Sequence, residues 1–313
     1  MHEPQQNARH DLGMGPVRPS RIGQILRIRD RGRLRWRKMT PMFSFERLAI
    51  LYFALFSVVA LFGGRGRRRP LPAALGAIAT VAGIVGISRT TPVAVRVWIP
   101  HLYLVVGYWL PALLVDSHVS PTFEAWLVET DRRFRQYQVS MPRWMTHSVE
   151  LAYLMCYPAV PVALAVVWMR GTVVDAERFW LSVLAAGFLC YGNLPWLPSR
   201  PPRLLDHHPA GSTHPDHPLA VAHNSGSHVF GLLNTAVLTR VSHQLNTFPS
   251  GHVAVSVSAA ACAFTVWWPA GLALALVATG IAIGAVAGRY HYVVDVLLGV
   301  GVGLVSVLLF VAL

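Results

Sequence analysis

The chain has 313 residues, of which 54% are hydrophobic and only 13% are charged, and its mean hydropathy is +0.45. One water-soluble core cannot hide so much apolar surface, so the composition excludes an ordinary soluble enzyme and predicts an all-α, polytopic membrane bundle. The formal net charge of +13 would also suit nucleic acid, but the arginines gather in a tail and in short loops rather than beside aromatic residues on a folded face. We therefore expect membrane lipids, and no nucleic acid, as partners.

The first part of the chain differs from the rest. Residues 1–46 carry ten of the 27 basic residues and no long apolar run, which is typical of a disordered cytoplasmic arm attracted to anionic lipid. Membrane helices are expected over 47–148 and again over 149–313. About eight spans, within a range of six to eight, are predicted at 48–64, 71–88, 94–115, 149–169, 178–196, 252–268, 270–287 and 292–312. The third window is the least typical, because Arg96 and His101 lie in its first half.

Two polar segments separate these windows. The segment from Ser120 to Arg143 mixes aromatic residues with arginines, which fits an interfacial membrane helix and equally an ordinary amphipathic loop helix. The loop at 204–244 holds seven histidines and raises a metal hypothesis, but its irregular spacings and its Pro, Gly and Ser content favour a flexible cap. Three isolated cysteines in apolar windows predict packing rather than disulfides or a metal site: Cys156, Cys190 and Cys262.

Two histidines stand in polar motifs at the starts of apolar segments. The run Phe248-Pro249-Ser250-Gly251-His252 opens one segment, and Gly288-Arg289-Tyr290-His291 opens another, four residues before Asp295. A histidine and an aspartate four residues apart share one helical face, so Asp295 can hold the imidazole of His291 in one tautomer and stabilise its charge. This is a way to build a histidine nucleophile.

When the spans are counted along the chain, three polar segments fall at the same membrane boundary: 196–203, 248–252 and 289–295. A shared site is the simplest explanation, and its residue types suit a phosphoryl group. Arginine presents fixed forks to phosphate oxygens, and the start of a helix presents backbone N–H groups. The expected phosphate ligands are Arg200, Arg203, Arg289 and the residues Ser250 and Gly251, whose N–H groups we expect to be free.

These motifs resemble the three-part signature of the type 2 phosphatidic acid phosphatase superfamily of membrane phosphatases and phosphotransferases. The resemblance rests on the run Asn193–Pro201, on Pro-Ser-Gly-His ending at His252, and on Arg289 with His291 and Asp295. The segments Pro201-Pro202-Arg203 and Arg289-Tyr290-His291-Tyr292-Val293-Val294-Asp295 look most like the branch that contains inositol phosphorylceramide synthase. Two positions depart from the family pattern: Asn193 replaces a lysine, and Ala285 replaces an arginine.

The resemblance implies a catalytic membrane core over 149–313 that cleaves a lipid phosphate or phospholipid. By that resemblance His291 is the nucleophile that forms a phosphohistidine, Asp295 orients it, and His252 protonates the leaving oxygen. The reaction would finish with water or with a polyol hydroxyl such as that of inositol. No metal and no other cofactor is implied.

Two other functions fit part of the sequence. A membrane transporter could use intramembrane His, Arg and Asp as an ion path, with the histidine loop gathering metal, but transport sites sit near mid-membrane and these motifs cluster at one boundary. An intramembrane serine protease built on Ser250 is the weakest alternative, because its nearest histidine lies beside it rather than across from it. Isolated histidines such as His101 and His147 are expected to be hydrogen-bonded interfacial residues.

The distribution of basic residues predicts which side the site faces. Under the eight-span count, 15 Lys and Arg residues lie opposite the site and 12 lie on its face. The positive-inside rule then predicts an integral protein of the cell membrane with an extracytoplasmic active site. The run Arg65–Arg69 on the outer face argues the other way.

Overall fold

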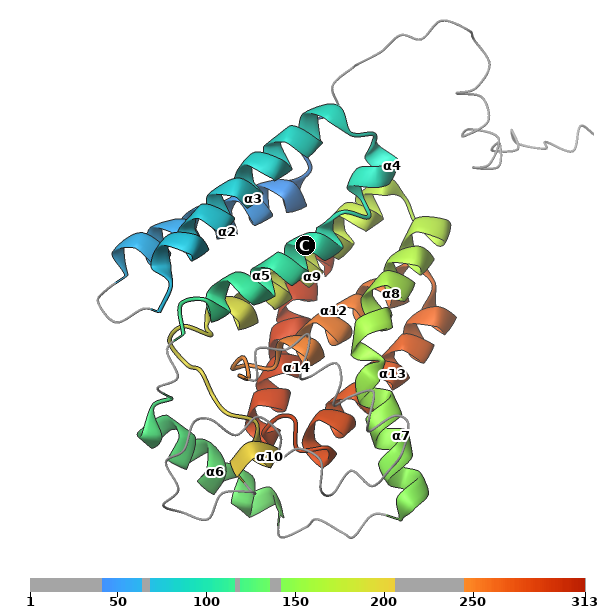
Figure 1. Ribbon diagram of the computed structural model, residues 1–313. Helices are drawn as coiled ribbons and strands as arrows, with labels where there is room; N and C mark the ends of the chain where they lie inside the picture. Colours follow the sequence, from blue (N-terminus) through green and yellow to red (C-terminus); the bar gives the residue numbers. More distant parts are fainter. Residues whose placement is uncertain (1–40, 64–67, 116–118, 136–141, 206–244, 313) are drawn as a thin grey trace, which may run out of the picture. The chain divides into compact units, whose positions relative to one another are not determined.

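The computed structural model describes residues 41–63, 68–115, 119–135, 142–205 and 245–312 (Figure 1). The described residues belong to one compact unit, Thr40–Leu313. They form helices and no strand, and the one isolated backbone bridge joins Ser199 and Asn246. Residues 1–40 of the expected arm and residues 206–244 of the histidine-rich loop lie outside the described residues.

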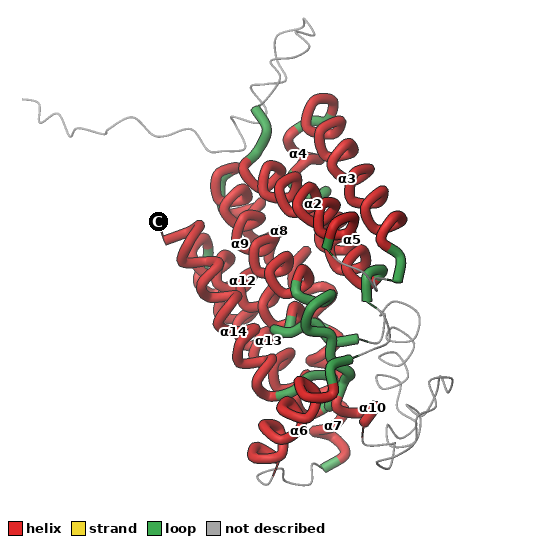
Figure 2. Tube along the Cα trace, turned by 90° about the vertical axis from the view of Figure 1, so that its left-hand side faces the viewer, coloured by secondary structure: helices red, strands yellow, loops and turns green. Residues whose placement is uncertain are grey.

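The first membrane helices are α2 (Ser44–Phe62), α3 (Pro70–Thr90), the short α4 (Val93–Arg96) and α5 (Pro100–Ala112). Proline starts both α3 and α5, where its missing N–H has no helical partner to lose and its fixed φ suits the first turn. The helices α2 and α3 pack side by side, as Figures 1 and 2 show, and α2 and α5 both pack on α9. These four helices therefore flank the remaining bundle.

The second part of the chain supplies the centre of the bundle. Its helices are α7 (Arg143–Leu154), α8 (Cys156–Arg170), α9 (Val173–Gly192), α12 (Gly251–Val266), α13 (Trp268–Ala287) and α14 (Val293–Val307), which continues into the π-helical turn η2 (Leu308–Ala312). The helix α12 packs on α8, α9, α13 and α14. A Cβ atom on Gly299 or Gly303 of α14 would lie 2.7 or 2.6 Å from a backbone oxygen of α12, so these glycines permit the close approach of the two helices.

Two short helices lie at the end of the bundle where α13 ends and α14 begins. They are α6 (Pro121–Arg135) and α10 (Pro202–Leu205), and both views place them there (Figures 1 and 2). The predicted amphipathic segment at 120–143 is thus helical over residues 121–135. Its apolar residue Leu127 is buried against Phe248 and Tyr292, while Arg132 and Arg133 are exposed.

The all-α polytopic membrane bundle predicted from the composition is confirmed. Among the described residues, five helices are long and apolar enough to cross a membrane, or up to six if α7 and α8, which are bent by 52° at their junction, form one span. All eight predicted windows are helical, but α12 has only 16 residues and α9 does not meet the same length and composition test. The three cysteines are free and buried.

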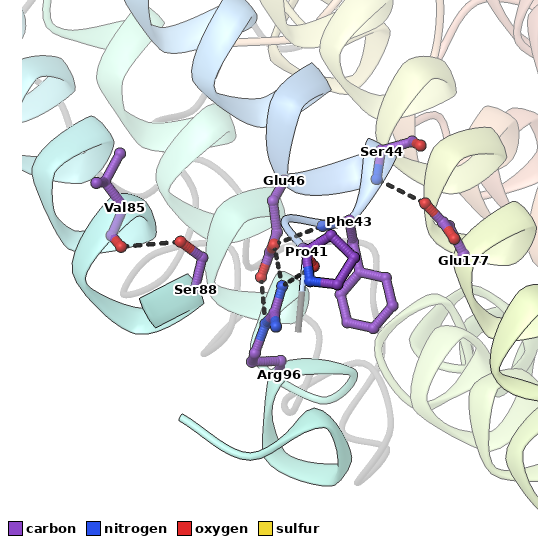
Figure 3. Close-up of polar contacts among 8 residues, drawn as sticks. All are labelled: Pro41, Phe43, Ser44, Glu46, Val85, Ser88, Arg96 and Glu177. Atoms are coloured by element: carbon purple, nitrogen blue, oxygen red, sulfur yellow. Dashed lines mark hydrogen bonds and ion pairs between the residues drawn. The ribbon is translucent and has the colours of Figure 1, made fainter. Parts of the chain in front are cut away.

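Arg96 explains the atypical third window. Its guanidinium is buried and donates from Nε and Nη2 to the two carboxylate oxygens of Glu46, at 2.8 and 2.5 Å (Figure 3). Nη2 also donates to the carbonyl of Pro41, and the guanidinium carbon lies 4.5 Å from the centroid of the Phe43 ring. A charged residue is tolerated within this apolar segment because it is paired and hydrogen-bonded.

Candidate active site

Backbone hydrogen bonds tie the three polar segments together. The N–H of Asn246 donates to the carbonyl of Ser199 at 2.7 Å, and the N–H of Arg203 donates to the carbonyl of Arg289 at 3.2 Å. The N–H of Ser250 donates to the carbonyl of Asp295 at 3.0 Å. Segments separated by up to about a hundred residues in the sequence therefore form one folded unit, as the span count predicted.

His291 and Asp295 form a buried pair. Nδ1 of His291 lies 3.2 Å from Oδ2 of Asp295, and both side chains are almost completely buried. The helix α14 begins at Val293, so Asp295 lies in its first turn and can reach back to the histidine just before the helix. A carboxylate accepts a hydrogen bond from Nδ1–H and thereby leaves the Nε2 lone pair available.

His252 faces the same space from the first turn of α12. Its ring centroid lies 5.9 Å from that of His291. At this separation both imidazoles can reach one phosphorus atom. Three tyrosine rings surround His252, at centroid distances of 6.0 to 6.4 Å: Tyr108, Tyr153 and Tyr157. Aromatic packing on several sides fixes the position of this imidazole.

Both histidines line a cavity of about 280 Å³. Polar groups form one part of its wall: Arg203, Asn246, Thr247, His252, Tyr290 and His291. Apolar residues of α5 and α8 form another part, including Leu104, Val105, Trp109, Val160 and Pro161. The cavity thus draws on α5, which lies outside the predicted catalytic core at 149–313, as well as on α7 and α8.

Of the three arginines expected to bind phosphate, Arg203 lines the cavity. Its guanidinium carbon lies 4.5 Å from the centroid of the Tyr290 ring, which in turn stacks on Tyr153 at 4.1 Å. The hydroxyl of Tyr290 donates to Glu150 Oε2 at 2.6 Å, so α7 holds the base of this stack. Burial lowers the pKa of Arg203 below its ordinary value, while Tyr290, Tyr153 and Glu150 oppose the shift, and an arginine remains charged near neutral pH.

Arg200 and Arg289 are held instead by carboxylates of α6. Arg200 donates from Nε to Glu124 Oε1 at 2.8 Å and from Nη2 to Glu124 Oε2, and this hydrogen bonding raises the pKa of Arg200. Nη1 of Arg289 lies 3.8 Å from Asp131 Oδ2. Neither arginine lines the cavity, because a nearby carboxylate competes for each guanidinium, and the expected phosphate-binding roles of Arg200 and Arg289 stay predictions.

The N–H groups of Ser250 and Gly251 are also differently placed from the expectation. The N–H of Ser250 donates to the carbonyl of Asp295, and the N–H of Gly251 donates to Thr247 Oγ1 at 3.1 Å, so both are already bonded. A Cβ atom on Gly251 would lie 2.2 Å from the ring of Tyr191, and close packing therefore explains the glycine. Oγ of Ser250 is buried and has no hydrogen-bond partner among the described residues.

Several residues of the site gave no recognisable signal in the sequence. Glu150 and Tyr153 of α7 support Tyr290, and Nδ2 of Asn246 donates to the carbonyl of Tyr290 at 2.6 Å. Glu124 and Asp131 bind the arginines from α6. Acidic residues in an otherwise basic, amphipathic segment are the only local hint that α6 pairs with arginines elsewhere.

Two further predictions concern metal binding and the isolated histidines. Within the described ranges, no three His, Cys, Asp or Glu side chains are grouped so as to hold a metal ion, and the histidine-rich loop lies outside those ranges. Nδ1 of His101 lies 2.9 Å from the carbonyl of Trp98, in agreement with the expected hydrogen-bonded role.

The sequence was compared with known proteins. A profile of the PAP2 superfamily matches residues 122–309, which is more than half of the chain. The match begins in α6 and extends past α14, so it includes all three polar segments and both histidines. No curated protein and no solved structure matched this sequence. The profile match gives no support to the transporter alternative.

Proposed function

The chain belongs to the PAP2 superfamily, and we propose that it cleaves a lipid phosphoester through a phosphohistidine formed on His291. Membership supports a phosphatase-type enzyme that acts on lipid phosphates. The finer proposal rests on one observation: two histidine rings lie 5.9 Å apart on one cavity wall, and a buried carboxylate is bonded to one of them. A phosphorus atom between the rings would meet a nucleophile and a proton donor together.

In the first step, His291 attacks through Nε2. Asp295 accepts the hydrogen bond from Nδ1, so the ring proton sits on Nδ1 and the lone pair on Nε2 faces the substrate. That lone pair forms the N–P bond while the ester P–O bond breaks, and its electron pair leaves on the lipid oxygen. Asp295 stabilises the positive charge that develops on the ring.

His252 handles the proton in both steps. The imidazolium of His252 donates its proton to the leaving oxygen, which departs as an alcohol. In the second step an oxygen of water or of a polyol hydroxyl attacks the phosphorus and loses its proton to His252. The N–P bond breaks and restores the lone pair on His291. Water yields a free phosphate group, and a hydroxyl yields a new phosphoester.

Arg203 is the proposed phosphate ligand within the cavity. It lines the same cavity as both histidines, and its Nε has no hydrogen-bond partner among the described residues, so this donor is available to a phosphoryl oxygen. The charge that develops on those oxygens would be stabilised by a guanidinium already held in place by Tyr290. Four other residues help to hold the folded site together in this proposal: Arg200, Arg289, Ser250 and Gly251.

The cavity wall also supports a lipid substrate. The apolar part contributed by α5 and α8 suits a hydrocarbon chain, while the polar part suits a phosphorylated head group. Val105 and Tyr157, which line the cavity from α5 and α8, are also partly exposed on the surface of their helices. The proposed substrate is therefore a phospholipid or lipid phosphate taken from the bilayer.

Transfer to a polyol such as inositol is the proposed second half-reaction. It is supported by the likeness of the motifs to the inositol phosphorylceramide synthase branch, and by the contact between two residues of those motifs, Arg203 and Tyr290. Two residues that carry this likeness thus lie together in space.

Product analysis tests this proposal. Purified protein in lipid is incubated with candidate phospholipids, with and without inositol, and free phosphate and phosphodiester products are measured. A new phosphoester of inositol supports transfer, whereas free phosphate or a released phosphorylated head group without an inositol phosphoester supports a phosphatase. Neither product from any lipid phosphate would contradict the proposed function.

The proposed location is the cell membrane, with the site on the extracytoplasmic face, because more basic residues lie opposite the site than beside it. The exposed residue Glu129 of α6 offers a test, since α6 lies at the site end of the bundle. A Glu129→Cys variant should react with a membrane-impermeant thiol reagent in intact cells. Reaction only after the cells are opened would place the site on the cytoplasmic face of the membrane.

A further inference from the structure

The helix α6 contacts all three polar segments of the site. Glu124 binds Arg200 of the first segment, and Phe123 packs edge-on against Phe248 of the second at a centroid distance of 5.2 Å. Leu127 is buried with Tyr292 of the third segment. An amphipathic helix outside the spans is thus joined to every part of the site, and one residue of it is joined to the segment that carries His291.

The carboxylate of Asp131 contacts residues on both sides of His291 in the sequence. Oδ1 accepts a hydrogen bond from the N–H of Val293 at 3.3 Å, two residues after His291. Oδ2 lies 3.8 Å from Nη1 of Arg289, two residues before His291. Asp131 itself is buried, with 5% of its surface exposed. One side chain therefore contacts both ends of the five-residue segment that has His291 at its centre.

Both contacts suit a carboxylate. Val293 is the first residue of α14, and the cap residue Tyr292 makes no side-chain hydrogen bond to the helix, so Asp131 supplies an acceptor from another helix. A negative charge there also interacts favourably with the helix dipole. Arg289 has a φ of 57°, a left-handed conformation that is unfavourable for a non-glycine residue and persists only where the surroundings hold it.

We infer that Asp131 is a positioning residue for His291: it fixes the backbone on both sides of the nucleophile so that the ring faces the cavity while bonded to Asp295. This inference rests on the proposed function, because it assumes that His291 attacks phosphorus. Misplacing a nucleophile lowers the rate of the chemical step more than it lowers substrate binding.

The full-length protein offers a matched set of variants. Asp131→Ala removes both contacts, and Asp131→Asn keeps an acceptor for Val293 while removing the charge that faces Arg289. Glu129→Gln is the control, because Glu129 lies on the same helix, is exposed, and among the described residues pairs with its helical neighbours Arg132 and Arg133. Each variant is purified as a monodisperse peak, and kcat and KM are measured with p-nitrophenyl phosphate.

The expected result is a loss in kcat with little change in KM. Asp131→Ala should lower kcat by about 10- to 100-fold, Asp131→Asn should lower it less, and Glu129→Gln should match the wild type. A role in folding alone would reduce the yield of monodisperse protein but leave its kcat unchanged, and that result would overturn the inference. If Asp131→Ala gives no monodisperse protein, Asp131→Asn decides by the same criterion.

His291→Ala is measured in parallel to separate the two proposals. If His291→Ala is inactive while Asp131→Ala retains the wild-type kcat, the positioning role is wrong and the proposed function stands. If His291→Ala remains active, the proposed function is wrong, and the positioning role falls with it.

Discussion

Two buried ionic groups lie at opposite ends of the bundle and differ in how completely they are bonded. Near α4, Arg96 is bonded to both oxygens of Glu46 and to a backbone carbonyl, and it lies against the Phe43 ring (Figures 1 and 3). At the other end, Asp295 uses one oxygen for His291, and its Oδ1 has no hydrogen-bond partner among the described residues.

The difference separates a structural pair from a site for chemistry. A buried polar group without a partner is costly, and it persists where a ligand can use it or where the protein needs its reactivity. Nε of Arg203 and Oγ of Ser250 share this condition with Asp295, and Arg203 lines the cavity. The pair of Glu46 and Arg96 should therefore matter for stability, and the group around His291 should matter for turnover.

The largest expected effect is that of His291→Ala, which should abolish turnover of every substrate because it removes the nucleophile. His252→Ala removes only the acid, whose contribution is typically about 10² to 10⁴ in rate and is smallest when the leaving group departs unaided. With p-nitrophenyl phosphate, His252→Ala should still form some phosphoenzyme, and His291→Ala should form none. Rapid-quench measurement of phosphoenzyme checks both. Equal retention of activity in the two variants would contradict the assigned roles.

The second effect falls on stability rather than on turnover. Arg96→Ala leaves Glu46 buried and unpaired, which should lower the free energy of unfolding by about 3–5 kcal/mol. Thermal unfolding in detergent measures the loss. The kcat of the folded fraction should stay near the wild-type value, because Arg96 does not line the cavity. A large fall in kcat without a loss of stability would contradict the proposed difference between the two ends of the bundle.

A smaller effect should distinguish two arginines of the same short segment. Arg203→Ala removes a charged donor from the cavity and should lower kcat/KM by about 10- to 100-fold. Arg200 is the matched control: 47% of its side chain is exposed and it is paired with Glu124, so Arg200→Ala should change kcat/KM by less than about fivefold. A larger loss for Arg200→Ala would restore it as the main phosphate ligand.

The smallest expected effect is that of chelation. The proposed charge for the phosphoryl oxygens comes from Arg203, so EDTA should leave kcat unchanged. The measurement uses the full chain, which retains the histidine-rich loop. Loss of turnover in EDTA that zinc or magnesium restores would assign a metal role to that loop.

The helices and the contact between His291 and Asp295 could be predicted from local sequence patterns. Long apolar windows predict membrane helices because the bilayer sets their length, and all eight windows are helical. The spacing of four residues between His291 and Asp295 predicts contact on one helical face, and the two side chains are bonded, although His291 lies just before α14 and only Asp295 lies within it.

The choice among arginines could not be predicted in the same way. Arg200 and Glu124 are 76 residues apart, and Tyr290 and Glu150 are 140 apart, so no local periodicity relates them. Which arginine faces the cavity depends on where α6 and α7 place their carboxylates, and that depends on packing over the whole bundle. Motif comparison therefore named Arg200, Arg203 and Arg289 alike, whereas of these three Arg203 lines the cavity.

The central claim is that phosphorus is transferred to His291, and trapping the phosphoenzyme tests it most directly. Wild-type protein is mixed with a phosphorus-labelled lipid phosphate, quenched in base, digested and mapped by mass spectrometry. We predict a base-stable, acid-labile phosphoryl group on His291, absent from His291→Ala and reduced in Asp295→Asn. A phosphoryl group on His252, or turnover with no phosphohistidine in any quenched sample, would contradict the account.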